Sequence, residues 1–309
     1  MNRIVIAALA LVAAAPLIAQ GRGGFLVEES GRSFGRLDDA VKSLQGRSGT
    51  ISVAPGSYPD CAVQEGGLLT IRATQPGAAI FDGGACEGKA TIVARGEALR
   101  VEGLIFQNIR VSDRNGAGIR LERGDLDIVN TLFRNSEQGV LTANENVGTI
   151  SVDRSTFSGL GGCPNGMCSH SLYIGVSAKL IVARSRFERG TGGHYVKTRS
   201  AEVDIRDSSF DDTQGKATNY MIDLSAGAVG TIANNVFVQG RDKENYSAFI
   251  AVAPEARDNP SAGLAISGND ASIAPGVNRQ TIFVADWSGE PLRLGSNRLG
   301  AGLKAFERR

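Results

Sequence analysis

The sequence is poor in the residue types on which several kinds of site depend. It has two His and one Trp among 309 residues, and only 6% of them are aromatic. Its net charge is +1 with no visible basic stripe, which argues against a nucleic-acid partner. Beyond residue 21 no further apolar run reaches membrane length. We therefore expect no nucleic-acid partner, and no membrane span beyond residue 21. No cofactor is indicated, although calcium remains open.

Short aliphatic strands recur about once every 25 residues, in two series that run in step. The first series ends on a phenylalanine each time: Phe106, Phe133, Phe157, Phe187, Phe210 and Phe237. The second lies between these strands: 118–122, 139–143, 171–175, 194–198, 221–225, 249–253 and 282–286. Gly, Asn, Asp and Ser separate the strands, and no helical pattern intervenes. A period of this kind indicates a solenoid, here a parallel β-helix.

The segment that precedes the repeats predicts a cap for the open end of the solenoid. Residues 33–44 place four apolar residues on one helical face: Leu37, Ala40, Val41 and Leu44. Gly46 and Gly49 end the helix, and TISVAPGSYPD (50–60) follows as strand, turn and strand. A short amphipathic helix would cover the hydrophobic cross-section and the unpaired strand edges.

This helix, its GTISVAPGSY continuation (49–58) and the stacked coils resemble the opening of right-handed parallel β-helix proteins of the pectate-lyase-like superfamily. We identify the chain as similar to exported bacterial members of that group. The resemblance implies an all-β fold: a single-stranded right-handed parallel β-helix with a short N-terminal capping α-helix. We assign residues 25–309 to this one domain and expect a monomer.

The first twenty residues are typical of a secretory signal peptide. Asn2 and Arg3 form a weakly basic start, residues 4–15 are continuously apolar, and small residues surround Ala15 and Ala19. We predict cleavage of residues 1–20 and a periplasmic or secreted protein. The alternative is an uncleaved membrane anchor.

The four cysteines suit an exported protein, because an even number in such a chain indicates disulfides. Cys61 and Cys86 are one repeat apart, and Cys163 and Cys168 enclose a short loop. We pair them by proximity as 61–86 and 163–168. Buried free thiols remain the alternative, whereas the spacing and the scarcity of histidine disfavour zinc.

Polar side chains recur at matching positions of three consecutive coils. His170 and His194 are 24 residues apart, and Tyr220 follows 26 residues later. Three positions further along each coil lie Tyr173, Lys197 and Asp223, and Arg199 follows Lys197 at a spacing of two. Adjacent strands are about 4.8 Å apart. We therefore predict one outward-facing group: His170, Tyr173, His194, Lys197, Arg199, Tyr220 and Asp223.

These residue types suit β-elimination on a uronic acid, the reaction of polysaccharide lyases in the superfamily that the chain resembles. A cation neutralises the carboxylate, a base takes the C5 proton, and an acid protonates the leaving oxygen. The expected substrate is a linear anionic polysaccharide. The candidate roles are base for Lys197 or His194, carboxylate neutraliser for Arg199, acid for Tyr173 or Tyr220, and orienting group for Asp223.

Other interpretations of the same residues stay open. Polar ladders also stabilise β-helices, and the chain lacks the Gly-His-Gly motif of polygalacturonases and the acidic calcium cluster of classical pectate lyases. A non-catalytic carbohydrate-binding protein is one alternative. A glycoside hydrolase, with carboxylates drawn from Asp204, Asp207 and Asp223, is another. As an exposed strand residue, Lys197 would contribute only about 0.5 kcal/mol or less to stability.

Overall fold

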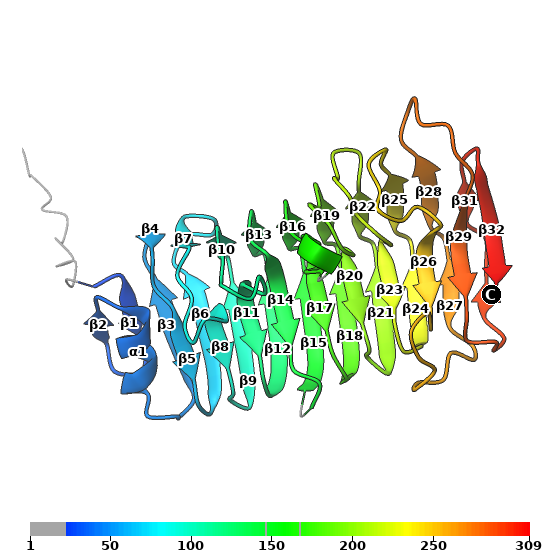
Figure 1. Ribbon diagram of the computed structural model, residues 1–309. Coiled ribbons are helices and arrows are strands. Elements are labelled where there is room, and N and C mark those ends of the chain that lie inside the picture. The colour runs from blue at the N-terminus through cyan, green and yellow to red at the C-terminus, as the bar shows by residue number, and fades with distance from the viewer. Residues whose placement is uncertain (1–22, 146, 167) are drawn as a thin grey trace, which may run out of the picture.

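The computed structural model describes residues 23–309 except 146 and 167. The predicted signal peptide lies outside the described residues. Each coil adds one strand to each of three parallel sheets, and about nine coils follow one another along the axis in chain order (Figure 1). The predicted all-β, right-handed parallel β-helix is therefore confirmed.

Strand order within each sheet follows the stacking of the coils. The first sheet contains β2 (Arg32–Phe34), β1 (Phe25–Val27), β3 (Gly49–Val53), β6 (Leu68–Ala73), β9 (Ala98–Glu102), β12 (Gly124–Val129), β15 (Val147–Asp153), β18 (Ser177–Ala183), β21 (Glu202–Arg206), β24 (Val229–Ala233), β27 (Ala265–Ser267) and β30 (Arg293–Leu294). The second contains β4 (Gly56–Tyr58), β7 (Ala79–Asp82), β10 (Leu104–Gln107), β13 (Leu132–Arg134), β16 (Thr156–Ser158), β19 (Arg186–Glu188), β22 (Ser209–Asp211), β25 (Val236–Gln239), β28 (Asp270–Ile273) and β31 (Arg298–Leu299). The third contains β5 (Ala62–Gln64), β8 (Ala90–Ala94), β11 (Ala117–Leu121), β14 (Gln138–Thr142), β17 (Leu172–Ile174), β20 (Val196–Thr198), β23 (Ile222–Leu224), β26 (Ala248–Val252), β29 (Thr281–Asp286) and β32 (Leu303–Arg308).

A column of phenylalanine rings runs through the core of the solenoid. Each ring of the predicted series pairs in register with the same position of the next coil. Phe157 lies 4.9 Å from Phe133 on one side and 4.9 Å from Phe187 on the other, and the rings are nearly parallel. Gly139 leaves room for this column, because a Cβ there would lie 2.7 Å from the Phe157 ring. The Phe spacing in the sequence thus sets the register of the coils.

A second column, of hydroxyl and amide side chains, lines the corner between the first and second sheets. Each backbone N–H at this corner donates to the side chain of the next coil, as Thr131 does to Ser155 Oγ at 3.1 Å. The residues of this corner ladder are Thr131, Ser155, Ser185, Ser208, Asn235, Asn269 and Asn297. These side chains satisfy buried amides where the chain turns and the sheet ladder is interrupted.

The N-terminal end of the solenoid is covered as the sequence predicted, with one addition. Helix α1 (Leu37–Ser43) buries Leu37, Ala40 and Val41 against the first coil. Strands β1 and β2, which the sequence analysis did not predict, pair antiparallel and extend the first sheet beyond β3. Their antiparallel direction breaks the parallel stacking and closes the end.

Both predicted disulfides are present. Cys61 bonds to Cys86 across adjacent coils, and Cys163 bonds to Cys168 around the short helix η1 (Pro164–Gly166). Two disulfides suit a protein of an oxidising compartment. In the part of the chain that the structure describes, no helix is long and apolar enough to cross a membrane.

Replacing Phe157 by Ala should lower the free energy of unfolding by about 3–5 kcal/mol, because the ring is fully buried between two others. Urea unfolding followed by circular dichroism measures this change. Val236→Ala, at an exposed position of β25, is the control and should change stability by about 0.5 kcal/mol or less. Equal midpoints for the two variants would contradict the role of the ring column.

Candidate functional site

The candidate site lies on the outer face of the third sheet, at β17, β20 and β23. Leu172, Val196 and Ile222 are paired in register and point into the core. The next position of each strand points outward, and there Tyr173 pairs with Lys197, and Lys197 with Asp223. The predicted outward column of Tyr173, Lys197 and Asp223 is thus present in the structure.

The two histidines and Tyr220 lie just before these strands and form a stack of rings. The ring centroids of His170 and His194 are 4.9 Å apart, and those of His194 and Tyr220 are 5.5 Å apart. The backbone N–H of His194 donates to His170 Nδ1 at 2.9 Å. Since Nδ1 accepts this bond, a neutral His170 carries its proton on Nε2.

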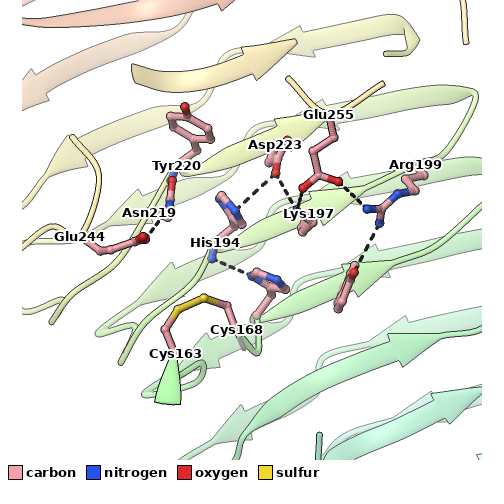
Figure 2. A network of polar contacts seen from close by, with 12 residues as sticks. Cys163, Cys168, His194, Lys197, Arg199, Asn219, Tyr220, Asp223, Glu244 and Glu255 are labelled. Carbon is pink, nitrogen blue, oxygen red and sulfur yellow. Dashed lines mark hydrogen bonds and ion pairs between the residues drawn. A yellow bond between two sulfur atoms is a disulfide. The ribbon is translucent and has the colours of Figure 1, made fainter. Parts of the chain in front are cut away.

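Asp223 joins the histidine stack to the lysine. Its Oδ2 lies 3.3 Å from Lys197 Nζ and 3.4 Å from His194 Nε2 (Figure 2). A neutral His194 therefore carries its proton on Nε2, where it faces the carboxylate. This leaves His194 Nδ1 and Asp223 Oδ1 buried without a hydrogen-bond partner among the described residues.

Glu255, which the sequence analysis did not single out, covers the outer side of this group. It lies in the segment after β26, and its carboxylate contacts both Lys197 Nζ and Arg199 Nη2 (Figure 2). Arg199 also lies 3.5 Å from the Tyr173 hydroxyl. The side chain of Glu255 is 43% exposed, so this carboxylate forms the boundary between the cation pair and solvent.

A second buried polar group supports the loops that lead into the site. The Asp212 carboxylate accepts hydrogen bonds from Tyr195 at 2.7 Å and Thr218 at 2.8 Å, and pairs with Lys243 at 3.2 Å. The ammonium of Lys243 also donates to the Asn219 carbonyl. Asp212 reads as a turn residue in the sequence, yet it is fully buried. Its partners Tyr195 and Thr218 belong to the segments that carry His194 and Tyr220, so Asp212 ties these segments together.

Burial and charge set the protonation states of the site. Burial, assisted by the charges of Lys197 and Arg199, lowers the pKa of His170 to about 3. Burial also holds the pKa of His194 well below its usual range. It raises the pKa of Asp223 to about 6, although Lys197 opposes that shift. Both histidines are therefore neutral near pH 7.

Lys197 keeps its charge in spite of its burial. Burial lowers the pKa of its ammonium, but Asp223 and Glu255 together outweigh that effect and raise it. The lysine has two carboxylates, whereas Asp223 has one lysine to offset complete burial and repulsion from Glu255. The pKa of Lys197 is therefore raised by its carboxylate partners, whereas the pKa of Asp223 is raised mainly by burial.

The burial of Lys197 corrects one expectation from the sequence. We expected an exposed strand lysine, but the residue is only 7% exposed. Its removal would leave Asp223 buried and unpaired, and breaking a buried pair in this way costs about 3–5 kcal/mol. Lys197→Ala therefore cannot separate a catalytic role from a structural one.

The other carboxylates considered for hydrolysis lie elsewhere. Asp204 belongs to β21 of the first sheet, and both Asp204 and Asp207 pair with Arg206. They do not join Asp223 on the third sheet. Among the described residues, no group of three or more His, Cys, Asp or Glu side chains is arranged to hold a metal ion.

Comparison with known proteins supports the fold. No family model matches the chain, and no curated protein matches its sequence. A solved structure of the PL6 family alginate lyase AlyGC matches with a TM-score of 0.53 and 14% identity, over 86% of this chain and 39% of that one. ORF18 of Geobacillus virus E2 matches with a TM-score of 0.51 and 14% identity, over 88% of this chain and 57% of that one. The chain thus spans well under two thirds of either protein, and it shares with them the parallel β-helix fold.

The shifted pKa values predict how stability depends on pH. The pKa of His170 is about 3 in the folded protein and 6.5 in its ordinary state, so acidification protonates the unfolded chain first. Stability should fall as the pH drops from 6.5 towards 3, by up to about 1.4 kcal/mol per pH unit for each such histidine. Asp223 has the opposite effect. Its pKa is about 6 in the folded protein and 3.8 in its ordinary state, so the folded protein takes up this proton first and gains stability as the pH falls below 6.

Urea unfolding at several pH values between 7 and 4 measures this dependence. His170→Asn should flatten the fall in stability that the wild type shows. Asp223→Asn should steepen the fall in stability between pH 6 and 4, because the variant lacks the carboxylate whose protonation stabilises the folded state in that range. Parallel curves for the wild type and His170→Asn would show that this histidine is not held neutral by the fold.

Proposed function

We propose that this chain is an exported polysaccharide lyase that cleaves a linear uronic-acid polymer by β-elimination. The proposal depends on one observation above all: the fold holds two cations, Lys197 and Arg199, around a single carboxylate. In the structure that carboxylate belongs to Glu255. The carboxylate of a uronic acid has the same shape and charge, and would take its place when Glu255 turns towards solvent.

Neutralising the substrate carboxylate is the part of the reaction that this pair would perform. A proton at C5 of a uronate becomes acidic when the adjacent carboxylate is bound by positive charge, because the transition state places negative charge there. Lys197 remains protonated, which suits it to this task and not to that of the base. Arg199 supplies the second positive charge and donates from a planar guanidinium.

Tyr173 is the group best placed to move the proton. Its side chain is half-buried on the same face, and its hydroxyl lies 3.5 Å from the Arg199 guanidinium. We assign its hydroxyl to donate its own proton to the glycosidic oxygen at C4 as the C4–O bond breaks, and to take the C5 proton in exchange, so that the phenol is neutral before and after the reaction. The products are a C4–C5 unsaturated uronide and a new reducing end, and the proposed reaction needs no cofactor.

His194 and Asp223 hold this machinery in place in our proposal. His194 is neutral and lies beneath the cations, where Asp223 binds both it and Lys197. The hydroxyl of Tyr220 lies 3.5 Å from Ser247 and away from the cation pair, which favours Tyr173 for the proton transfer. The likeness in fold to a protein described as an alginate lyase agrees with the proposed substrate class.

Tyr173→Phe is the sharpest test of the reaction, because it removes one hydroxyl from a half-buried residue and no charge. Turnover should fall by about 10²–10⁴-fold, the usual contribution of a general acid or base. Absorbance of unsaturated uronides on a panel of alginate, pectate and glucuronan measures it. Tyr220→Phe is the matched control and should keep its turnover within a few-fold. If the wild-type protein binds one of these polymers but releases no unsaturated uronide from any of them, the result would favour the carbohydrate-binding alternative.

Glu255→Gln tests the carboxylate site itself. The amide cannot compete for the cation pair as a carboxylate does, so KM for the polyuronate should fall by about two- to fivefold. Steady-state kinetics across substrate concentration separates KM from kcat. Glu244→Gln is the control, since this carboxylate pairs with the Asn219 amide away from the cations. A rise in KM together with a fall in kcat would instead make Glu255 a positioning residue for Lys197.

A further inference from the structure

A hollow opens over the third sheet on the C-terminal side of the candidate site. Its volume is about 600 Å³, and residues from β29, β32 and the segment before β26 line it. Asp223 pairs in register with Ala251, Ala251 with Ala285, and Ala285 with Glu307, which lines the hollow. Glu307, at the edge of the hollow, therefore lies four strand spacings, or about 19 Å, further along the axis than Lys197, and the two alanines between Asp223 and Glu307 are buried.

Tyr220 links the candidate site to the edge of the hollow. The Tyr220 hydroxyl, at the edge of the histidine stack, lies 3.5 Å from Ser247 Oγ. Ser247 is one of the residues that line the hollow. A polymer that extends from Lys197 to the hollow would pass on the Tyr220 side of the sheet, because Ala251 and Ala285 on the Lys197 column are buried.

Tyr246 gives the hollow an aromatic wall. It is 52% exposed, and the Arg279 guanidinium lies 4.8 Å from its ring centroid. Arg279 is itself held by a hydrogen bond to the Arg241 carbonyl. Contact with the guanidinium fixes the ring in place while leaving much of it open, and exposed aromatic rings at a hollow are typical of ligand sites.

The charges in the hollow repeat the arrangement at the candidate site. The Glu307 carboxylate lies 3.2 Å from Lys304 Nζ and 2.9 Å from Arg309 Nε. Two cations therefore hold one half-buried carboxylate, as Lys197 and Arg199 hold Glu255. The hydroxyls of Ser247 and Thr281 add polar groups to the lining. This combination suits a sugar ring that carries a carboxylate.

We propose that the hollow is a distal subsite, which binds a uronate unit several sugars away from the unit that reacts at Lys197. One sugar face packs on Tyr246, and its carboxylate takes the place of Glu307 between Lys304 and Arg309. The inference rests on the proposed function, because it assigns the hollow to the same polymer chain. Its consequence is that affinity depends on the length of the oligosaccharide.

Calorimetric titration with alginate and galacturonate oligosaccharides of increasing length, from the disaccharide upward, tests the subsite. Tyr173→Phe serves as the background protein, so that the oligosaccharides are not degraded. Affinity should rise by about tenfold or more once the chain is long enough to span the distance to the hollow. Adding Tyr246→Ala should abolish that rise, whereas adding Tyr246→Phe, which keeps the ring, should preserve it. Val236→Ala on the second sheet is the control for general effects on folding.

The outcomes separate the subsite from the reaction. A rise with length that survives Tyr246→Ala overturns the subsite and leaves the lyase proposal intact, provided that the wild type still releases unsaturated uronides. A wild-type protein that neither binds these oligosaccharides nor releases uronides overturns both. Loss of the rise in Tyr246→Ala together with its retention in Tyr246→Phe supports the subsite.

Discussion

Hydrogen bonding between the same position of successive coils is the constraint on which the rest of this structure depends. Parallel pairing fixes both the spacing of the coils and their register, so a residue type that recurs at one position becomes a continuous column. The phenylalanine rings fill the core in this way, and the ladder from Thr131 to Asn297 satisfies the corner amides. A slip of one residue in any coil would send its core side chain to the surface.

The same constraint explains why much of the site could be read from the sequence. Once the coils are in register, residues at matching positions of consecutive repeats must lie about 4.8 Å apart. The spacing of His170, His194 and Tyr220 therefore predicts a stack, and that of Tyr173, Lys197 and Asp223 predicts a column. The register of the strands determines which residues of successive coils are neighbours, so these predictions did not depend on the conformation of the loops.

Loops account for what the sequence did not predict. Glu255 reaches Lys197 from 58 residues away, in a segment between β26 and β27 that follows no repeat. The sequence feature that could have indicated a contribution from this segment is the long connection between β26, which pairs with the strand of Asp223, and β27. Lys197 is buried partly because Glu255 of this segment contacts it. Strand alternation, which takes no account of such a segment, predicts an exposed lysine. Asp212 is similar, because its partners Tyr195, Thr218 and Lys243 come from three coils.

A network of ion pairs near the N-terminal end of the third sheet offers a comparison with the candidate site. There Arg95 and Lys89 pair with Glu122 and Glu87 in a partly exposed network of opposite charges without histidine. The candidate site differs in that Lys197 and Asp223 are buried and in that two stacked histidines lie beside them. Buried charges and unpaired polar atoms destabilise a fold. The concentration of buried titratable groups beside the cation pair that holds Glu255 agrees with the proposed function, because such groups often gather at functional sites.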